Sequence, residues 1–195
     1  MIERNSRLPI NRTLDKLLSL LEKWDVGEKN CVLVDEFAYV LQGYDVRGPE
    51  VKSGHLDLYV NPKVLPWKDK GERSIIPPKD SSYMDDWADF MQETKHGLDM
   101  LRAEPEILQI PTVNYKLPSG KTIRLMRAFE MTKAFVKQTI MHYSLEDVGE
   151  DKIREWIDKL ELIKEAARKK ENTRLVEYCQ VQLIKAKDKW KEILV

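Results

Sequence analysis

The sequence predicts an α/β (α+β) fold in which a small mixed sheet is flanked by helices, followed by two appended helices. Short apolar or alternating runs typical of strands are interspersed with helical apolar spacing up to about residue 143. The remaining residues show helical spacing alone. We therefore expect one domain over residues 1–143 and an antiparallel helical pair over 144–195.

The first half of the expected domain alternates helix and strand. Leucines at three-four spacing predict a helix capped by Thr13 and running to about Trp24. The continuous apolar run 31–34 predicts a strand buried on both faces, and 35–42 returns to helical spacing before Gly43. Residues 55–60 alternate polar and apolar side chains, which predicts a second strand.

The second half begins with a long connection over residues 61–83 that contains four prolines. A helical stripe, a third strand at 97–101, a β-hairpin over 113–126 and a helix from Ala128 are expected after it. The helical stripe consists of Met84, Trp87, Ala88 and Met91.

The C-terminal residues carry two apolar stripes, one through Trp156 and Leu160 and another through Cys179 and Leu183. The polar segment 169–172 is the expected turn between them. The two apolar faces are expected to close on each other as a helical hairpin.

Composition narrows the class of protein. The 195 residues are 34% charged and 42% apolar, which fits neither a disordered, a collagenous nor a membrane protein. Lys and Arg number 33 and Asp and Glu number 33, so the whole chain carries no strong nucleic-acid signal, although a local basic patch stays open. Without a signal peptide or a spanning stretch, we expect a cytoplasmic protein with no membrane partner.

Two cysteines stand without zinc-type spacing, and no phosphate-binding P-loop or nucleophile elbow is present. These absences disfavour a disulfide framework, a structural metal knuckle, a serine hydrolase and an ATPase.

The stretch from Val34 to Val60, VDEFAYVLQGYDVRGPEVKSGHLDLYV, resembles the nucleotidyltransferase superfamily, whose fold is that of DNA polymerase β. In that family a strand and a short helix precede a second strand with an Asp-x-Asp pair. The resemblance extends over roughly residues 14–143 and implies a nucleotidyltransferase-like sheet.

The resemblance also implies a site. His55 and Asp57 occupy the paired positions, and Asp99 is the candidate for the third carboxylate. Side chains at i and i+2 of a strand share one face, so these three residues are expected to bind a divalent metal, Mg²⁺ or Mn²⁺, together with a nucleoside triphosphate. Asp57 and Asp99 are the expected catalytic residues.

Basic residues around this segment are candidates for phosphate contact, namely Arg47 and Lys52 before the second strand and Lys133 on the following helix. Asp35 and Glu36 stand where the family has its glycine pair, and His55 stands where it has its first Asp. Two acidic side chains near a triphosphate would weaken nucleotide binding.

Ordinary structural interpretations stay open beside these. Asp57 could be a surface carboxylate, Asp99 could lie on an edge strand, and Asp35 and Glu36 could form the exposed first turn of a helix. The basic run 167–170 is flanked by glutamates and is interpreted as a charged helix end.

Two functions follow as hypotheses. The first is a divergent nucleotidyltransferase that transfers a nucleoside monophosphate to a hydroxyl group of a protein, an RNA or a small molecule. The alternative is a catalytically inactive protein of the same fold that acts as a binding or regulatory partner through its helical hairpin.

Overall fold

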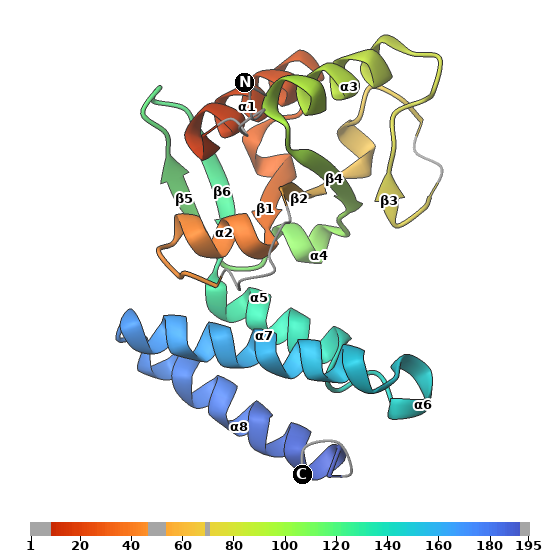
Figure 1. The fold of residues 1–195 in the computed structure, drawn as a ribbon. Helices are drawn as coiled ribbons and strands as arrows, with labels where there is room; N and C mark the ends of the chain where they lie inside the picture. Colours follow the sequence, from red (N-terminus) through yellow and green to blue (C-terminus); the bar gives the residue numbers. More distant parts are fainter. Residues whose placement is uncertain (1–8, 47–53, 69–70, 192–195) are drawn as a thin grey trace, which may run out of the picture. The chain divides into compact units, whose positions relative to one another are not determined.

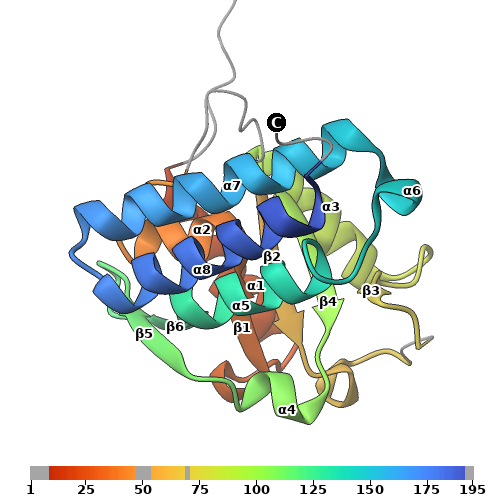
Figure 2. The same ribbon diagram turned by 90° about the horizontal axis from the view of Figure 1, so that it is seen from below.

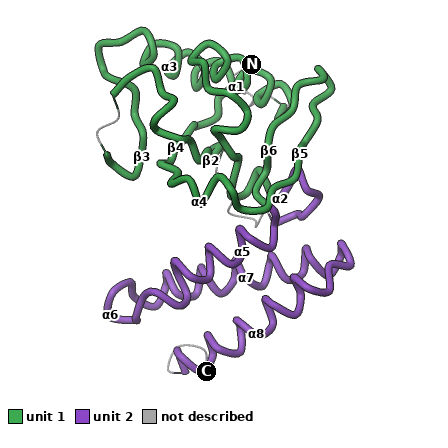
Figure 3. Tube along the Cα trace, turned by 180° about the vertical axis from the view of Figure 1, so that it is seen from behind, with its two compact units in different colours: residues 1–38, 52–126 green, residues 39–51, 127–195 purple. Residues whose placement is uncertain are grey.

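The computed structural model describes residues 9–46, 54–68 and 71–191. Their contacts divide the chain into two compact units, shown in green and purple in Figure 3. Unit 1 comprises residues 1–38 and 52–126, and unit 2 comprises residues 39–51 and 127–195. The short helix α2 (Asp35–Leu41) begins in the first unit and ends in the second.

Unit 1 is built on a six-stranded mixed sheet of order β3-β4-β2-β1-β6-β5 (Figure 1). Its strands are β1 (Cys31–Val34), β2 (His55–Val60), β3 (Ser74–Ile75), β4 (Gly97–Arg102), β5 (Thr112–Lys116) and β6 (Thr122–Met126). The central strand β1 pairs antiparallel with β2 and parallel with β6, while β2 pairs parallel with β4. The strands next to each other at the centre of the sheet therefore come from distant parts of the chain.

The helices of unit 1 are α1 (Ile10–Lys23), α3 (Ser82–Thr94) and the single turn α4 (Pro105–Leu108), with 3₁₀ turns η1 (Glu28–Asn30) and η2 (Pro62–Val64). Helices α1 and α3 pack side by side (Figure 1). Trp24 at the end of α1 lies edge-on to Trp67, with ring centroids 5.2 Å apart, and also donates its indole N–H to Asp86 of α3. These contacts hold the connection after β2 against the two helices.

Burial follows the side-chain period of each strand. All four residues of β1 are buried, as expected for a central strand covered on both faces. In β2 the apolar side chains of Leu56, Leu58 and Val60 are buried, whereas the alternate residues face the other side. The sheet thus has one largely apolar face and one face on which β2 and β4 carry the polar side chains of His55, Asp57 and Asp99.

Unit 2 consists of helices that include α5 (Ala128–Gln138), the single turn α6 (Leu145–Val148), α7 (Glu150–Lys169) and α8 (Thr173–Lys189). Helices α7 and α8 form the hairpin, and α5 packs beside α8 (Figure 2). The end of α2 joins this unit through a buried hydrogen bond of 2.7 Å between the hydroxyl groups of Tyr39 and Thr132. Asn172, in the α7–α8 turn, donates to the Tyr44 hydroxyl at 2.8 Å.

Most predicted elements are confirmed: the strands near 31–34, 55–60 and 97–101, the hairpin, the helix from Ala128 and the helical hairpin with its turn at 169–172. The predicted cap at Thr13 is wrong. Helix α1 begins four residues earlier, at Ile10, and the buried Thr13 hydroxyl donates to the Pro9 carbonyl instead.

The helix predicted from the stripe of Met84, Trp87, Ala88 and Met91 is confirmed as α3, and three of these four side chains are half-buried. Ala88 is exposed, and the helix buries Phe90 and Thr94. The connection 61–83 contains η2 and the short strand β3 in addition to irregular backbone. The division between domains at residue 143 stays a prediction. None of the described helices combines the length and the apolar character needed to traverse a bilayer.

Candidate functional site: a carboxylate cluster on the sheet

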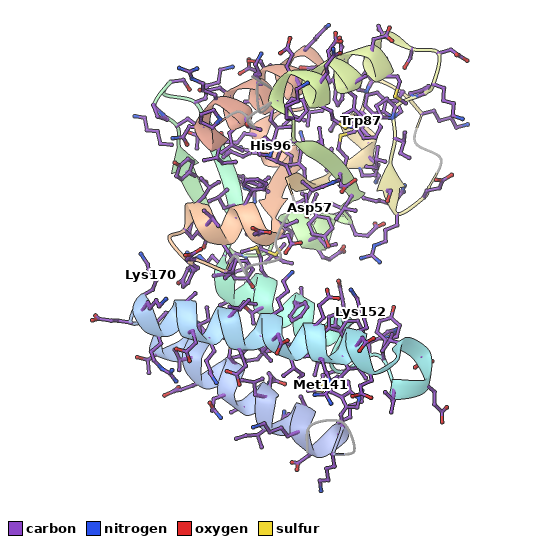
Figure 4. The ribbon with its side chains drawn as sticks, in the orientation of Figure 1. Asp57, Trp87, His96, Met141, Lys152 and Lys170 are labelled. Atoms are coloured by element: carbon purple, nitrogen blue, oxygen red, sulfur yellow. The ribbon has the colours of Figure 1, made fainter. Side chains whose placement is uncertain are left out.

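Strand register determines where the acidic side chains lie. In the antiparallel β1–β2 pair Val34 stands opposite Asp57, and in the parallel β2–β4 pair Asp57 stands beside Asp99. Residues at the same register on neighbouring strands project from the same face of a sheet. Asp57, labelled in Figure 4, and Asp99 therefore share one face, which is the face opposite the buried leucines of β2.

Asp35 brings a further carboxylate to this face. It follows Val34, the last residue of β1, and its backbone has a φ of 58°, in the left-handed region. This conformation turns the chain from strand into helix α2, and aspartate tolerates it better than most residues do. The side chain of Asp35 forms a hydrogen bond with that of Asp57, so the two carboxyl groups are in direct contact.

The proximity of these acids changes the ionisation of Asp57. Burial is the largest effect, and together with the negative charges of Asp35 and Asp99 it raises the pKa of Asp57 from 3.8 to about 7. His55 opposes this rise. At neutral pH the Asp57 carboxyl is thus partly protonated and is able to share a proton with Asp35.

His55, at the start of β2, lies beside Asp99 of the neighbouring strand β4. Its Nδ1 atom lies 3.0 Å from an Asp99 carboxylate oxygen, and both side chains are more than half exposed. The ring lies over Gly97, since a Cβ atom added to that glycine would come within 2.4 Å of His55 Nδ1. The absence of a side chain at Gly97 therefore allows the imidazole to reach Asp99.

The structure places three of the predicted site residues, His55, Asp57 and Asp99, on one face of the sheet. Arg47 and Lys52 lie outside the described residues. Lys133 lies on α5 in unit 2, where its ammonium group pairs with Glu130 at 3.1 Å. Phosphate contact by these three basic residues stays a prediction.

Asp35 and Glu36 form the first turn of α2, as one interpretation of the sequence expected, but that turn is not exposed. Both are half-buried, and Asp35 belongs to the cluster. Sequence reasoning missed this role because the contact depends on Val34 pairing with Asp57, which no local pattern reveals. The available signal was an acidic residue directly after a buried strand.

The chemistry of the donors fits a hard divalent cation, because carboxylate oxygens are its preferred ligands and a nearby imidazole broadens the choice to Mn²⁺. Within the described parts of the chain, however, no three His, Cys, Asp or Glu side chains converge as a ready-formed metal site. Binding of a cation therefore requires side-chain rotation, which the half-exposed Asp99 and His55 are free to make.

Neither cysteine supplies a nucleophile. Burial raises the pKa of Cys31 to about 11 and that of Cys179 to about 12. Both thiols are therefore protonated at neutral pH, and an inaccessible thiol is a poor nucleophile and a poor metal ligand.

Comparison with known proteins assigns no family, since neither a protein-family model nor a curated protein sequence matches this chain.

Proposed function

We propose that the protein binds a nucleotide together with a divalent cation at the carboxylate cluster, as a divergent nucleotidyltransferase that transfers a nucleoside monophosphate to a hydroxyl acceptor. The observation that carries this proposal is the register that sets Asp57 beside Asp99 on one face of the sheet. The mixed sheet with β1, β2 and β4 adjacent is compatible with the nucleotidyltransferase-like topology proposed for it.

The electrostatics of the cluster also support cation binding. Burial, and after it the negative charges of Asp35 and Asp99, raises the pKa of Asp57, so keeping this carboxylate ionised has a free-energy cost. A cation among these carboxylates would favour their ionised forms and remove that cost. Electrostatic attraction within the cluster thus favours binding of a cation.

Each residue then has a role in the proposed reaction. Asp57 and Asp99 would hold the cation, and His55, already hydrogen bonded to Asp99, would orient that carboxylate. When bound, the cation would offset negative charge on the phosphate oxygens during transfer. Asp57 must lose its proton to act as a ligand, so the site would work best above pH 7.

Thermal unfolding in the presence of Mg²⁺ or Mn²⁺, with and without each nucleoside triphosphate, tests the proposal. A ligand that binds only the folded state raises the melting temperature. We expect a rise with cation and nucleotide together that is lost in Asp57→Asn and Asp99→Asn. Asp89→Asn, which changes an exposed carboxylate of α3, is the matched control and should retain it.

A specific observation favours a second candidate, an inactive protein of this fold that serves as a binding or regulatory partner. Asp35, which contacts Asp57, stands where the nucleotidyltransferase superfamily has a glycine. The negative charge of Asp35 would repel a triphosphate. No rise in melting temperature with any nucleotide, in the wild type and in Asp35→Asn alike, would contradict nucleotide transfer and leave this second function.

A further inference from the structure

We propose that unit 2 carries a binding site for single-stranded nucleic acid along the seam between α5 and α8. The seam is defined by Phe129, Lys133 and Lys137 of α5 and by Arg174, Tyr178 and Lys185 of α8. These side chains come from segments more than thirty-five residues apart in the sequence, so the surface exists only in the folded chain.

The two helices run alongside each other in the same direction (Figure 2). Near their starts the rings of Phe129 and Tyr178 are in contact, with centroids 5.2 Å apart. Near their ends Lys189 donates from its ammonium group to the Ile140 carbonyl at 3.0 Å. Positions spaced by about one turn along each helix therefore continue the same seam.

A cation and an aromatic ring form a stacked platform at the start of the seam. The guanidinium carbon of Arg174 lies over the Phe129 ring, 4.1 Å from its centroid, and Lys133 Nζ lies 5.8 Å from the same centroid. Phe129 and Tyr178 are half-buried, whereas Arg174 and Lys133 are exposed. A planar guanidinium backed by an aromatic ring is a surface on which a nucleobase can stack.

Positive charge continues along both helices. Lys137 follows Lys133 by one turn on α5, and Lys185 lies two turns beyond Tyr178 on α8, and both are exposed. From Arg174 to Lys185 the seam extends about 16 Å at a rise of 1.5 Å per residue. It is therefore long enough to follow several phosphates of an extended strand.

The balance of charge on these helices differs from that on α7. Helices α5 and α8 together contain six basic and three acidic residues, whereas α7 contains six of each. Basic residues of α7 such as Lys152 and Arg154 pair with glutamates of the same helix. On α5 Lys133 pairs with Glu130 of the same helix. Among the described residues no carboxylate pairs with Lys137, Arg174 or Lys185, so these three side chains keep their positive charge within the part of the chain that the structure describes.

This combination favours a single strand over other polyanions. Cations alone would attract a duplex or an acidic peptide equally, because both present negative charge. The platform of Arg174 and Phe129 adds affinity only for a ligand with free aromatic faces, which the stacked bases of a duplex do not offer.

Fluorescence anisotropy of the full chain with labelled oligouridylate tests the site, with a duplex and a polyglutamate peptide as competitors. We expect binding that weakens with salt, with a log–log slope that falls by about 0.7 for each cation removed. Lys137→Ala and Lys185→Ala should each show that change. Lys152→Ala, which removes a paired lysine of α7 labelled in Figure 4, should not.

Arg174→Lys separates stacking from charge. It keeps the positive charge but loses the planar group over Phe129, so affinity should fall about fivefold or more while the salt slope is unchanged. Circular dichroism verifies that each variant is folded. The proposal would be overturned by an absence of binding, by competition from polyglutamate as strong as that from RNA, or by equal losses in Lys137→Ala and Lys152→Ala.

Discussion

The carboxyl group of Asp57 couples the site to stability. The group has a pKa of 3.8 when the chain is unfolded and about 7 in the fold, so the folded state binds the proton more tightly. Its stabilising contribution is therefore complete below about pH 4 and is lost as the pH rises through 7. Between pH 4 and pH 7 the contribution of Asp57 to the free energy of unfolding therefore decreases as the pH increases.

Asp57→Asn should accordingly increase the free energy of unfolding at pH 8 and change that free energy little at pH 5. Asparagine can still bond to Asp35 but carries no charge beside Asp35 and Asp99. We expect a gain on the order of 1–2 kcal/mol in the free energy of unfolding at pH 8, because solvent screens part of the repulsion. Urea unfolding at both pH values measures it, with Asp89→Asn as the control. An equal loss of stability at both pH values would contradict the raised pKa.

At the scale of the elements, the stability of the turn between β1 and α2 depends on which residue occupies position 35, because the backbone there is left-handed. Asp35 has a φ of 58° there. Asp35→Asn keeps a residue suited to this conformation and removes a charge, so it should stabilise the protein at pH 8. Asp35→Val places a branched side chain at positive φ and should cost on the order of 1–2 kcal/mol at any pH. Urea unfolding distinguishes the two, and similar effects from both variants would contradict this account of the turn.

Strands β2 and β4 approach each other closely where the His55 ring lies over Gly97. In Gly97→Ala the new Cβ atom would overlap the His55 ring, so we expect a loss on the order of 1–3 kcal/mol. In a His55→Ala background the ring is gone, and the same substitution should cost much less. A double-mutant cycle by urea unfolding measures this coupling. Additive effects would show that the ring does not lie over Gly97.

Elements were predictable from the sequence where the pattern is local. The continuous run of β1, the alternation of β2 and the turn of the β5–β6 hairpin each carry their own signal. The start of α1 was not predictable, because its N-cap is Pro9, whose side chain makes no capping hydrogen bond. The fully buried residues of α3, Phe90 and Thr94, were not predictable because tertiary packing selects them. The two-residue strand β3 is too short to show any period.

The candidate site was predictable only in part for the same reason. His55 and Asp57 share a strand, so their common face follows from spacing alone. The place of Asp99 required β4 to lie beside β2 at matching register, and the place of Asp35 required β1 to pair with β2. Pairing between strands is a property of the folded chain, so the sequence alone does not predict the contact between Asp35 and Asp57, and Asp99 is expected only from the resemblance.

For the whole molecule, cation binding and protonation compete for the same carboxylate. Proton release from Asp57, with its pKa of about 7, must accompany binding of Mn²⁺ to the cluster. The affinity for Mn²⁺ should therefore increase about tenfold between pH 6 and pH 8 and then level off. Isothermal titration of the full chain across this range measures the increase.

Two variants distinguish whether the pH dependence of Mn²⁺ binding comes from Asp57 or from His55. Asp57→Asn has no proton to release at this position, so any binding that remains should vary little between pH 6 and pH 8. His55→Asn removes the imidazole and leaves the Asp35–Asp57 contact, so it should bind more weakly and still show the increase. A wild-type affinity that is constant over the range would show that the cation does not bind Asp57. An increase lost in His55→Asn but kept in Asp57→Asn would assign the proton to the imidazole instead.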